Sequence, residues 1–463
     1  MVALSAASAV TAATCWTAAD TWVGRWTFDA AEVVGTVCAE AAPIFCVVTE
    51  GIVLSRARLL KEYRHVAPKT QGSIVIFPQP INLDANASYG VLPEVRARLG
   101  ECLEGLNPSS IHAGGQRARA AIERARDAVA ALLGLRGGER IVFTSGATEA
   151  NVTAIEAPFG EDQVSRSGAG DGPLWITSAL EHHSVLEPCA RLGRRGFRGV
   201  VITPADGAVH GAEIAAHISP HTRLVTCMAA NNEIGHLTPL EEIVRVVRAA
   251  AERCVIHSDA VQILGKVKWN PFDAGVDSVS LSAHKIGALS GVGALVVRTG
   301  AEPPPLIVGG PQELRYRAGT ENVPGIVSFG LAADIVRRTL DERIERMRRG
   351  AELLRGELSR LVPEITFNSP REDGLPNTVS VTAPGIRADD VVVALDLAGV
   401  YVSSGAACAS GKPEPSHVLL ARGLPEAAAR ATLRLSVRAD HTTIELEQAA
   451  AAIARAITAG RSR

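Results

Sequence analysis

From residue 81 onward, short apolar runs alternate with longer segments whose apolar residues recur at helical spacing. Runs of this length bounded by turn residues are typical of buried strands, and the longer segments are typical of amphipathic helices. The alternation predicts an α/β fold in which helices connect the strands of a mostly parallel sheet. The expected strands are 141–146, 174–177, 223–230, 254–260 and 278–285, and the clearest helices between them are 116–134 and 240–253.

The pattern changes near residue 330. A charge-rich segment with helical periodicity covers 331–360 and predicts one long connecting helix. The segments after it predict a small α+β domain, with strands at 377–383 and 432–437 and a helix near 388–398. We therefore expect a large domain over residues 79–335 and a small C-terminal domain over residues 336–463.

The first 78 residues have a different composition. They are rich in Ala, Val and Thr and contain three of the five Trp and three of the eight Cys. No basic region opens the segment, which argues against a secretory signal, and Asp20, Arg25 and Asp29 interrupt any stretch long enough to cross a bilayer. We interpret residues 1–78 as an accessory extension, and its sequence suggests no function.

Composition limits the partners of the 463-residue chain. Apolar residues make up 47% and charged residues 21%, as in ordinary globular proteins. The formal net charge of −2 provides no overall attraction to nucleic acid or to an anionic membrane. The cysteines are scattered without a CxxC pair, which argues against a disulfide framework and a zinc site. We expect a cytoplasmic protein with no metal, nucleic-acid or membrane partner.

Two residues near strand ends have side chains suited to a cofactor site. Lys285 ends the run 278–285 and precedes a glycine-rich segment. Most lysines at such positions are surface charges, but an amine that attacks an aldehyde needs both desolvation and freedom to reach it. Asp259 closes the run 254–260, where a helix-capping aspartate is the ordinary interpretation. A carboxylate that keeps a pyridine-type ring nitrogen protonated would explain Asp259 and Lys285 together.

A possible phosphate site follows the first expected strand. The segment TSGATEAN at 144–151 has small residues, including Ala147, that let backbone N–H groups approach a phosphate, and Thr148 adds a hydroxyl. Many turns between a strand and a helix look similar, so this motif is weak by itself. Ser282 and His284 beside the lysine are two more possible phosphate donors.

Cys408 is the best candidate for a reactive thiol. It lies in the segment VSSGAACASG at 402–411, which is rich in Gly, Ser and Ala. A buried structural cysteine is the commonest alternative, but such a residue is expected among apolar neighbours. We interpret the other seven cysteines as core or extension residues.

Six motifs together resemble the cysteine desulfurase family, class V of the pyridoxal-phosphate aminotransferase fold (fold type I). They are SGATEAN, NNEIG at 231–235, HSDAVQ at 257–262, SAHK at 282–285, RAGTEN at 317–322, and SSGAAC at 403–408 with PSHVL at 415–419. They occur in the family's order from about Asn82 to the C-terminus, and the segment after Cys408 is similar to the iron–sulfur-assembly and nitrogen-fixation branch. The sequence departs from the family at Ser88 and Tyr89, where two threonines are common, and at Pro311, where glycine is commoner.

The resemblance implies a role for each matching residue. Lys285 would bind pyridoxal 5'-phosphate covalently, and Cys408 would receive sulfur from L-cysteine. The other matching residues would hold the cofactor or the substrate: His182 against the ring, Asp259 at the ring nitrogen, Asn232 and Gln262 at the O3′ side, Ala147, Thr148, Ser282 and His284 at the phosphate, Thr320 at the phosphate of a partner subunit, and Arg434 with Asn232 at the substrate.

The implied reaction converts L-cysteine to L-alanine and leaves a persulfide on Cys408. Lys285 would move the Cα proton and His182 would assist catalysis. The resemblance further implies a homodimer that passes sulfur to an acceptor or iron–sulfur scaffold protein. Another class V activity, such as selenocysteine lyase or aminotransferase, and a catalytically silent scaffold of the same fold are the alternatives.

Overall fold

The computed structural model describes residues 79–103, 106–160, 172–204, 207–404 and 414–461. All of them belong to one of the two units of the chain, Thr70–Arg463. The expected extension at 1–78 and Cys408 lie outside the described residues.

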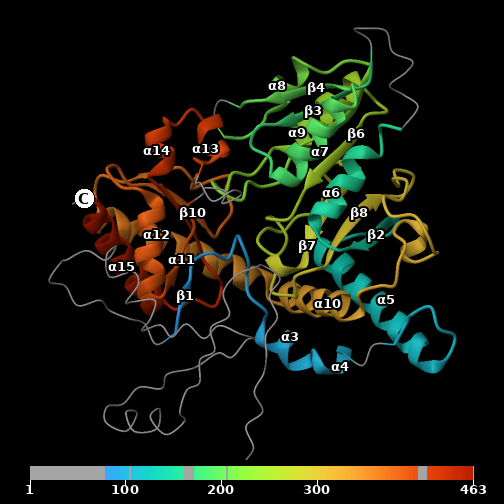
Figure 1. Ribbon diagram of the computed structural model, residues 1–463, viewed down its shortest axis with the longest axis horizontal. Helices are drawn as coiled ribbons and strands as arrows, with labels where there is room; N and C mark the ends of the chain where they lie inside the picture. The colour runs from blue at the N-terminus through green and yellow to red at the C-terminus, as the bar shows by residue number, and fades with distance from the viewer. Residues whose placement is uncertain (1–78, 104–105, 161–171, 205–206, 405–413, 462–463) are drawn as a thin grey trace, which may run out of the picture. The chain divides into compact units, whose positions relative to one another are not determined.

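A mixed sheet of seven strands forms a large part of the fold (Figure 1), and two of its strands end at the expected cofactor residues Asp259 and Ser282. Strands β3 to β7 are paired in parallel, whereas β8 is antiparallel to both β2 and β7. All residues of β3 and β7 are buried, as expected for strands of a parallel sheet covered on both faces. In spatial order the strands are β2 (Glu139–Thr144), β8 (Gly293–Arg298), β7 (Ser278–Ser282), β6 (Val255–Asp259), β5 (Thr222–Thr226), β3 (Leu174–Ser178) and β4 (Arg198–Ile202). The predicted α/β fold with a mostly parallel sheet is confirmed.

Two long helices pack closely beside this sheet. An added Cβ at Gly330 of α10 would lie 2.5 Å from Ala125 Cα of α5, so the crossing requires glycine. Helix α5 buries Ile122, Ala125 and Val129 on one face and ends at Gly134, which has the left-handed φ of 65° favoured by glycine. The helices between β1 and β9 are α3 (Pro93–Arg98), α4 (Gly100–Leu103), α5 (Ala113–Leu133), α6 (Ala147–Glu156), α7 (His183–Arg194), α8 (Gly211–Ala215), α9 (Leu240–Ala250), α10 (Val323–Arg338) and α11 (Leu340–Leu361).

A second hydrophobic core surrounds a smaller antiparallel sheet, β12-β10-β9. Its strands are β9 (Thr366–Phe367), β10 (Thr378–Thr382) and β12 (Thr432–Ser436), and the later helices are α12 (Ala388–Ala398), α13 (His417–Ala421), α14 (Glu426–Arg430) and α15 (Thr443–Arg461). Strand β1 (Ile81–Asn82) pairs in parallel with β11 (Val400–Tyr401) (Figure 1). Ile81 and Leu83 are therefore buried in this second core, although they precede the main sheet in the sequence.

The expected single helix over 331–360 is wrong. Helices α10 and α11 meet at Thr339, whose φ of −115° and ψ of 11° are not helical. The Thr339 hydroxyl donates to the Ile335 carbonyl at 2.9 Å, a local bond by which threonine competes with the helical pattern.

The expected strand over 278–285 is shorter than predicted. β7 ends at Ser282, and the next three residues form the 3₁₀ turn η3 (Ala283–Lys285). The strands expected at 174–177 and 432–437 and the helix near 388–398 are confirmed.

The carboxyl ends of parallel strands meet at one edge of a sheet, where ligands of such folds bind. β6 ends at Asp259, β7 ends at Ser282, and the segment after β3 leads to His182 at the start of α7. An isolated bridge between Asp84 and Ser436 brings the segment after β1 beside β12, which carries Arg434.

Candidate active site

The amine of Lys285 rests on two backbone carbonyl groups. Nζ donates to Asn86 O at 2.7 Å and to Ala87 O at 3.0 Å. Burial, and then the positive charge of Arg434, lower the pKa of Lys285 to about 8, against the opposite effect of Asp259 and Asp84. A lysine with this pKa has a substantial neutral fraction near physiological pH, as a nucleophilic amine or a proton-transfer base requires.

Asp259 is held in one orientation from both sides. The carboxylate is 6% exposed, and its Oδ1 accepts from Val261 N at 3.0 Å. Its Oδ2 accepts from Asn151 Nδ2 at 2.8 Å, which fixes the orientation of that amide because a carboxylate only accepts. Asn151 Oδ1 then accepts from His257 Nε2 at 3.0 Å. Burial lowers the pKa of His257 to about 3, so this histidine is neutral with its proton on Nε2.

His182 is connected to the same network. It caps α7, and its Nδ1 accepts from Ser184 N at 3.1 Å and lies 2.8 Å from Ser184 Oγ. Asn151 Nδ2 donates to Ser184 Oγ at 2.9 Å, so the two expected site residues His182 and Asp259 are joined through one asparagine. Burial, against the effect of Asp259, lowers the pKa of His182, which keeps the ring neutral. His182 and Thr148 line one pocket of about 460 Å³.

The start of α6 lies against the main sheet at a glycine. Gly293 of β8 pairs with Ser282 of β7, and an added Cβ at Gly293 would lie 2.6 Å from Gly146 C and 2.8 Å from Ala147 N. The missing side chain therefore lets the first N–H groups of α6 approach Ser282. A helix N-terminus in this position favours an anion such as a phosphate.

His284 lies between Ser282 and Lys285 in the same segment. Burial, followed by the charge of Lys285, lowers the pKa of His284 to about 4. His284 is therefore a neutral ring that offers one N–H.

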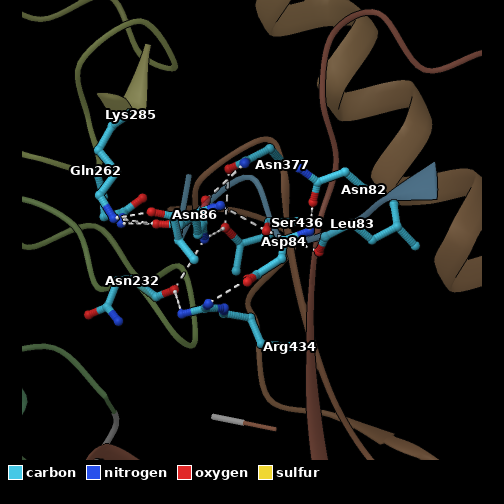
Figure 2. Close-up of polar contacts among 12 residues, drawn as sticks. Asn82, Leu83, Asp84, Asn86, Asn232, Gln262, Lys285, Asn377, Arg434 and Ser436 are labelled. Atoms are coloured by element: carbon cyan, nitrogen blue, oxygen red, sulfur yellow. Dashed lines mark hydrogen bonds and ion pairs between the residues drawn. The ribbon is translucent and has the colours of Figure 1, made fainter. Parts of the chain in front are cut away.

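Three more residues that we expect to bind the cofactor or the substrate, Gln262, Asn232 and Arg434, lie around Asn86, as Figure 2 shows. Gln262 Nε2 donates to Asn86 O at 3.0 Å, and the Asn232 carbonyl accepts from Asn86 Nδ2 at 3.1 Å. Arg434 donates from Nη1 to Asn232 O at 3.3 Å and pairs through Nη2 with Asp84 Oδ1 at 2.7 Å. The structure thus brings Lys285, Gln262, Asn232 and Arg434 together.

Arg434 retains one unused donor. Its Nε is buried and has no hydrogen-bond partner among the residues that the structure describes. Since buried donors are almost always paired, this atom points to a missing acceptor, and a carboxylate is the acceptor that a guanidinium binds best.

Thr320 is exposed on the segment between η4 (Glu313–Arg315) and α10. The same segment is attached to the start of α6, because Arg317 Nε pairs with Glu149 Oε1 at 3.0 Å. The expected contact between Thr320 and a partner subunit stays a prediction.

The three cysteines whose side chains the structure describes are buried core residues. Burial raises the pKa of Cys254 to about 12 and raises the pKa values of Cys189 and Cys227 further. None of these three thiols is suited to act as a thiolate nucleophile near neutral pH. The candidate nucleophile Cys408 lies outside the described residues.

Within the described ranges, no group of three His, Cys, Asp or Glu side chains is arranged to hold a metal ion. No helix in that part of the chain is long and apolar enough to cross a membrane.

Comparison with known proteins identifies the family. The model of the family "Aminotransferase class-V" matches residues 81–448. The chain belongs to this family. Relatives named cysteine desulfurase match most of its length, which places it in the cysteine desulfurase branch.

Two curated relatives illustrate the similarity. Cysteine desulfurase IscS of Dictyoglomus turgidum is 39% identical over 72% of this chain and 82% of its own. Cysteine desulfurase of Gluconacetobacter diazotrophicus is 38% identical over 80% of this chain and 91% of its own. Enzymes of this family depend on pyridoxal phosphate.

Two solved structures have the same fold. A NifS-like protein superposes with a TM-score of 0.75 and 32% identity, covering 82% of this chain and all of its own. DndA of Streptomyces lividans has a TM-score of 0.61 and 34% identity, covering 75% of this chain and 96% of its own.

Four residues of the site were not anticipated from sequence. They are Asn86, Lys266, Asn151 and Asp84, and each contacts a residue that we expect to bind the cofactor or the substrate. None of them has a local sequence signal of function. Asn151 ends the motif SGATEAN, which does not predict its contacts, and the other three residues lie outside the six motifs. Their partners lie far away in the sequence, and only the fold reveals them.

Proposed function

We propose that this chain is a pyridoxal-phosphate-dependent cysteine desulfurase that converts L-cysteine to L-alanine and passes the sulfur to Cys408 as a persulfide. The observation that carries the proposal is the Lys285 amine, which two backbone carbonyls hold and whose pKa responds to the charges of Arg434 and Asp259. This combination provides a nucleophilic base, a carboxylate for a ring nitrogen and a guanidinium for the substrate carboxylate. The substrate in the proposal, L-cysteine, is inferred from the relatives that are named cysteine desulfurase.

The described residues fit the cofactor. Asp259 is buried and oriented for a cationic ring nitrogen, and the start of α6 is free of a side chain from Gly293. In our proposal Lys285 binds the cofactor covalently and Asp259 holds the ring nitrogen. His182 would lie against the ring, Gln262 and Asn232 would bond its O3′ side, and Ala147, Thr148, Ser282 and His284 would hold the phosphate, with Thr320 contributed by a partner subunit.

Bound pyridoxal phosphate supplies an electron sink that stabilises negative charge at the substrate Cα. We assign the substrate carboxylate to Arg434, an assignment that its unpaired Nε supports, with Asn232 beside it. Lys285 takes the Cα proton, because its lowered pKa leaves part of the population neutral near pH 7 to 8.

Cys408 then completes the transfer of sulfur. Its thiolate attacks the substrate sulfur, a new S–S bond forms, and the bond between sulfur and Cβ breaks with its electron pair staying on carbon. Protonation of that carbon and return of a proton to Cα from the Lys285 amine give alanine, and Cys408 keeps the persulfide. A serine hydroxyl at this position is not a comparable nucleophile. Replacing Cys408 by serine therefore distinguishes a desulfurase, which needs the thiol, from an aminotransferase or a lyase, which does not.

The alternatives need fewer of these residues. An aminotransferase or selenocysteine lyase requires Lys285 and Asp259 but no thiol at position 408, and a silent scaffold requires none of the three. Nothing in the described site favours these alternatives over a desulfurase.

The direct test is production of alanine and sulfide from L-cysteine by the purified protein loaded with pyridoxal phosphate. Lys285→Ala should abolish both products, because no other nitrogen replaces the amine. Arg136→Ala, which changes an exposed ion pair with Asp273, serves as the control and should keep the wild-type rate. Wild-type turnover in Lys285→Ala would overturn the proposal.

The cellular setting is also part of the proposal. We infer a cytoplasmic homodimer that delivers sulfur to an acceptor or iron–sulfur scaffold protein, in agreement with the IscS name of one relative. The scattered cysteines and the balanced charge support a reducing compartment and a protein acceptor.

A further inference from the structure

The carbonyl group that holds Lys285 belongs to a residue with no spare hydrogen-bonding capacity. Asn86 is 1% exposed and offers three N–H hydrogens and two carbonyl oxygens. Its backbone N–H donates to Ser436 Oγ at 2.9 Å. Its side-chain Nδ2 donates to Asn232 O at 3.1 Å and to Thr378 Oγ1 at 2.9 Å, so every donor is used.

Both oxygens of Asn86 accept two bonds each. The side-chain Oδ1 accepts from Lys266 Nζ at 2.8 Å and from Asn377 Nδ2 at 3.0 Å. The backbone oxygen accepts from Lys285 Nζ at 2.7 Å and from Gln262 Nε2 at 3.0 Å. A carbonyl oxygen has two lone pairs, so no acceptor remains and the group has one permitted orientation. Figure 2 shows Lys285 and Gln262 reaching Asn86 from one side and Asn377 and Ser436 from the other.

Lys266 is a second amine in this cluster. It is 2% exposed, and burial, reinforced by the charge of Lys285, lowers its pKa well below the ordinary value. A neutral amine has two hydrogens, and Lys266 has two acceptors, Asn86 Oδ1 and Gln262 Oε1, the latter at 2.6 Å. Lys266, Gln262 and Asn86 therefore close a ring of hydrogen bonds, and burial disfavours a second positive charge beside Lys285.

The turn that contains Asn86 also binds Arg434. The turn is closed by the bond from Ala87 N to Asp84 O at 3.0 Å, and Asp84 Oδ1 pairs with Arg434 Nη2 at 2.7 Å. Residues 84–87 thus hold Arg434 at one end and Lys285 at the other. In an amino acid the carboxylate carbon is bonded to Cα, so a carboxylate ligand and a Cα base must keep a fixed separation.

We propose that Asn86 is a positioning residue that holds the free amine of Lys285 at a fixed place relative to Arg434 for transfer of the substrate Cα proton. The proposal rests on the proposed function, since that function gives Lys285 a proton to move. The side chain of Asn86 acts indirectly, because it locks its own backbone carbonyl, and that carbonyl holds the amine.

The test follows exchange of the Cα hydrogen of L-alanine with solvent deuterium, measured by NMR on the protein loaded with pyridoxal phosphate. This exchange requires the Lys285 base but no sulfur transfer, so Cys408 does not influence it. Asn86→Ala should lower the rate at saturating alanine, per bound cofactor, by about 10- to 100-fold, the loss expected for a displaced catalytic group. The half-saturating alanine concentration should stay near the wild-type value, because Arg434 and Asp84 are retained.

Asn270→Ala is the matched control. The Asn270 side chain, like that of Asn86, both accepts and donates hydrogen bonds, with Phe272 N at 3.0 Å and Gly134 O at 2.9 Å, but it has none with the Asn86 cluster. This variant should exchange alanine at the wild-type rate.

A second readout needs no cofactor. In the cofactor-free full-length chain, Asn86→Ala should increase the rate at which a small acylating reagent modifies Lys285, because the backbone carbonyl of residue 86 is no longer locked by a side chain and holds the amine less firmly. Exposed Lys268, followed by mass spectrometry in the same sample, corrects for reagent concentration.

Both changes are required, so an unchanged exchange rate or unchanged Lys285 labelling in Asn86→Ala would overturn the inference. If Asn86→Ala is insoluble, Asn86→Ser, which keeps one hydroxyl in the cluster, is held to the same two measurements. Failure of the proposed function looks different: the wild-type protein itself would neither exchange alanine nor release sulfide.

Discussion

Replacing Arg434 by glutamine should raise the pKa of Lys285 in the cofactor-free protein. Burial and Arg434 are the two causes that lower this pKa to about 8, and Asp259 and Asp84 act in the opposite direction. Arg434→Gln removes a positive charge and frees Asp84 from its ion pair, so both consequences favour the charged amine. Burial is unchanged, and the new value should stay below that of an ordinary lysine, about 10.4.

The magnitude follows from the two pKa values. With a pKa of about 8, roughly a quarter of Lys285 is neutral at about pH 7.5, against roughly one part in 800 for an ordinary lysine of pKa about 10.4. The neutral fraction is therefore about 200-fold larger. Each pKa unit gained in Arg434→Gln should reduce this advantage by about tenfold.

The assay is the pH dependence of acylation of Lys285, measured by mass spectrometry with Lys268 as the reference. The midpoint gives the pKa whatever the accessibility of the amine. Arg136→Gln, at an exposed ion pair with Asp273, is the control and should leave the midpoint near 8. A wild-type midpoint close to that of an ordinary lysine, or a midpoint in Arg434→Gln that is unchanged or lower, would refute this explanation of the lysine's reactivity.

Two further predictions concern buried polar groups. Asn151→Ala leaves Asp259 Oδ2 without its partner at 2.8 Å, and an orphaned buried group costs about 1–3 kcal/mol, so affinity for pyridoxal phosphate should fall by about 5- to 150-fold in an absorbance titration. Unchanged affinity would remove Asn151 from the cofactor site. Glu313→Gln breaks a buried pair in which Arg126 donates from both Nη atoms at 3.0 Å, and the loss of about 3 kcal/mol should appear as a clearly lower melting temperature. A melting temperature equal to that of the wild type would contradict this energetic role.

The fold was predictable because its strongest signals are local. The buried strands β3, β5, β6 and β7 lie in short segments with apolar residues, bounded by turn residues, so the sequence pattern located them within a few residues. Asp259 at the end of β6 was predictable for the same reason, because a carboxylate that closes an apolar strand faces the ligand edge of the sheet. The break at Thr339 was not predictable, since the helical periodicity continues across it and the interruption depends on one local side-chain bond.

The supporting residues of the site were not predictable, because their roles depend on distant partners. Asn86 bonds to Asn232 across 146 positions and to Ser436 across 350. No local pattern distinguishes such an asparagine from one in a turn. Lys266 is similar: in sequence it resembles its exposed neighbour Lys268, and only burial against Gln262 reveals its role.

The central claim is that sulfur from cysteine is carried by Cys408 in a site built around Lys285. The most direct measurement is mass spectrometry of the protein loaded with pyridoxal phosphate, mixed with L-cysteine and digested without reductant. Our account predicts one added sulfur atom on the peptide containing Cys408, and no added sulfur on any peptide of Cys408→Ser, although that variant still binds pyridoxal phosphate and still exchanges the Cα hydrogen of alanine. Full release of sulfide by Cys408→Ser, or added sulfur only on another cysteine, would contradict it.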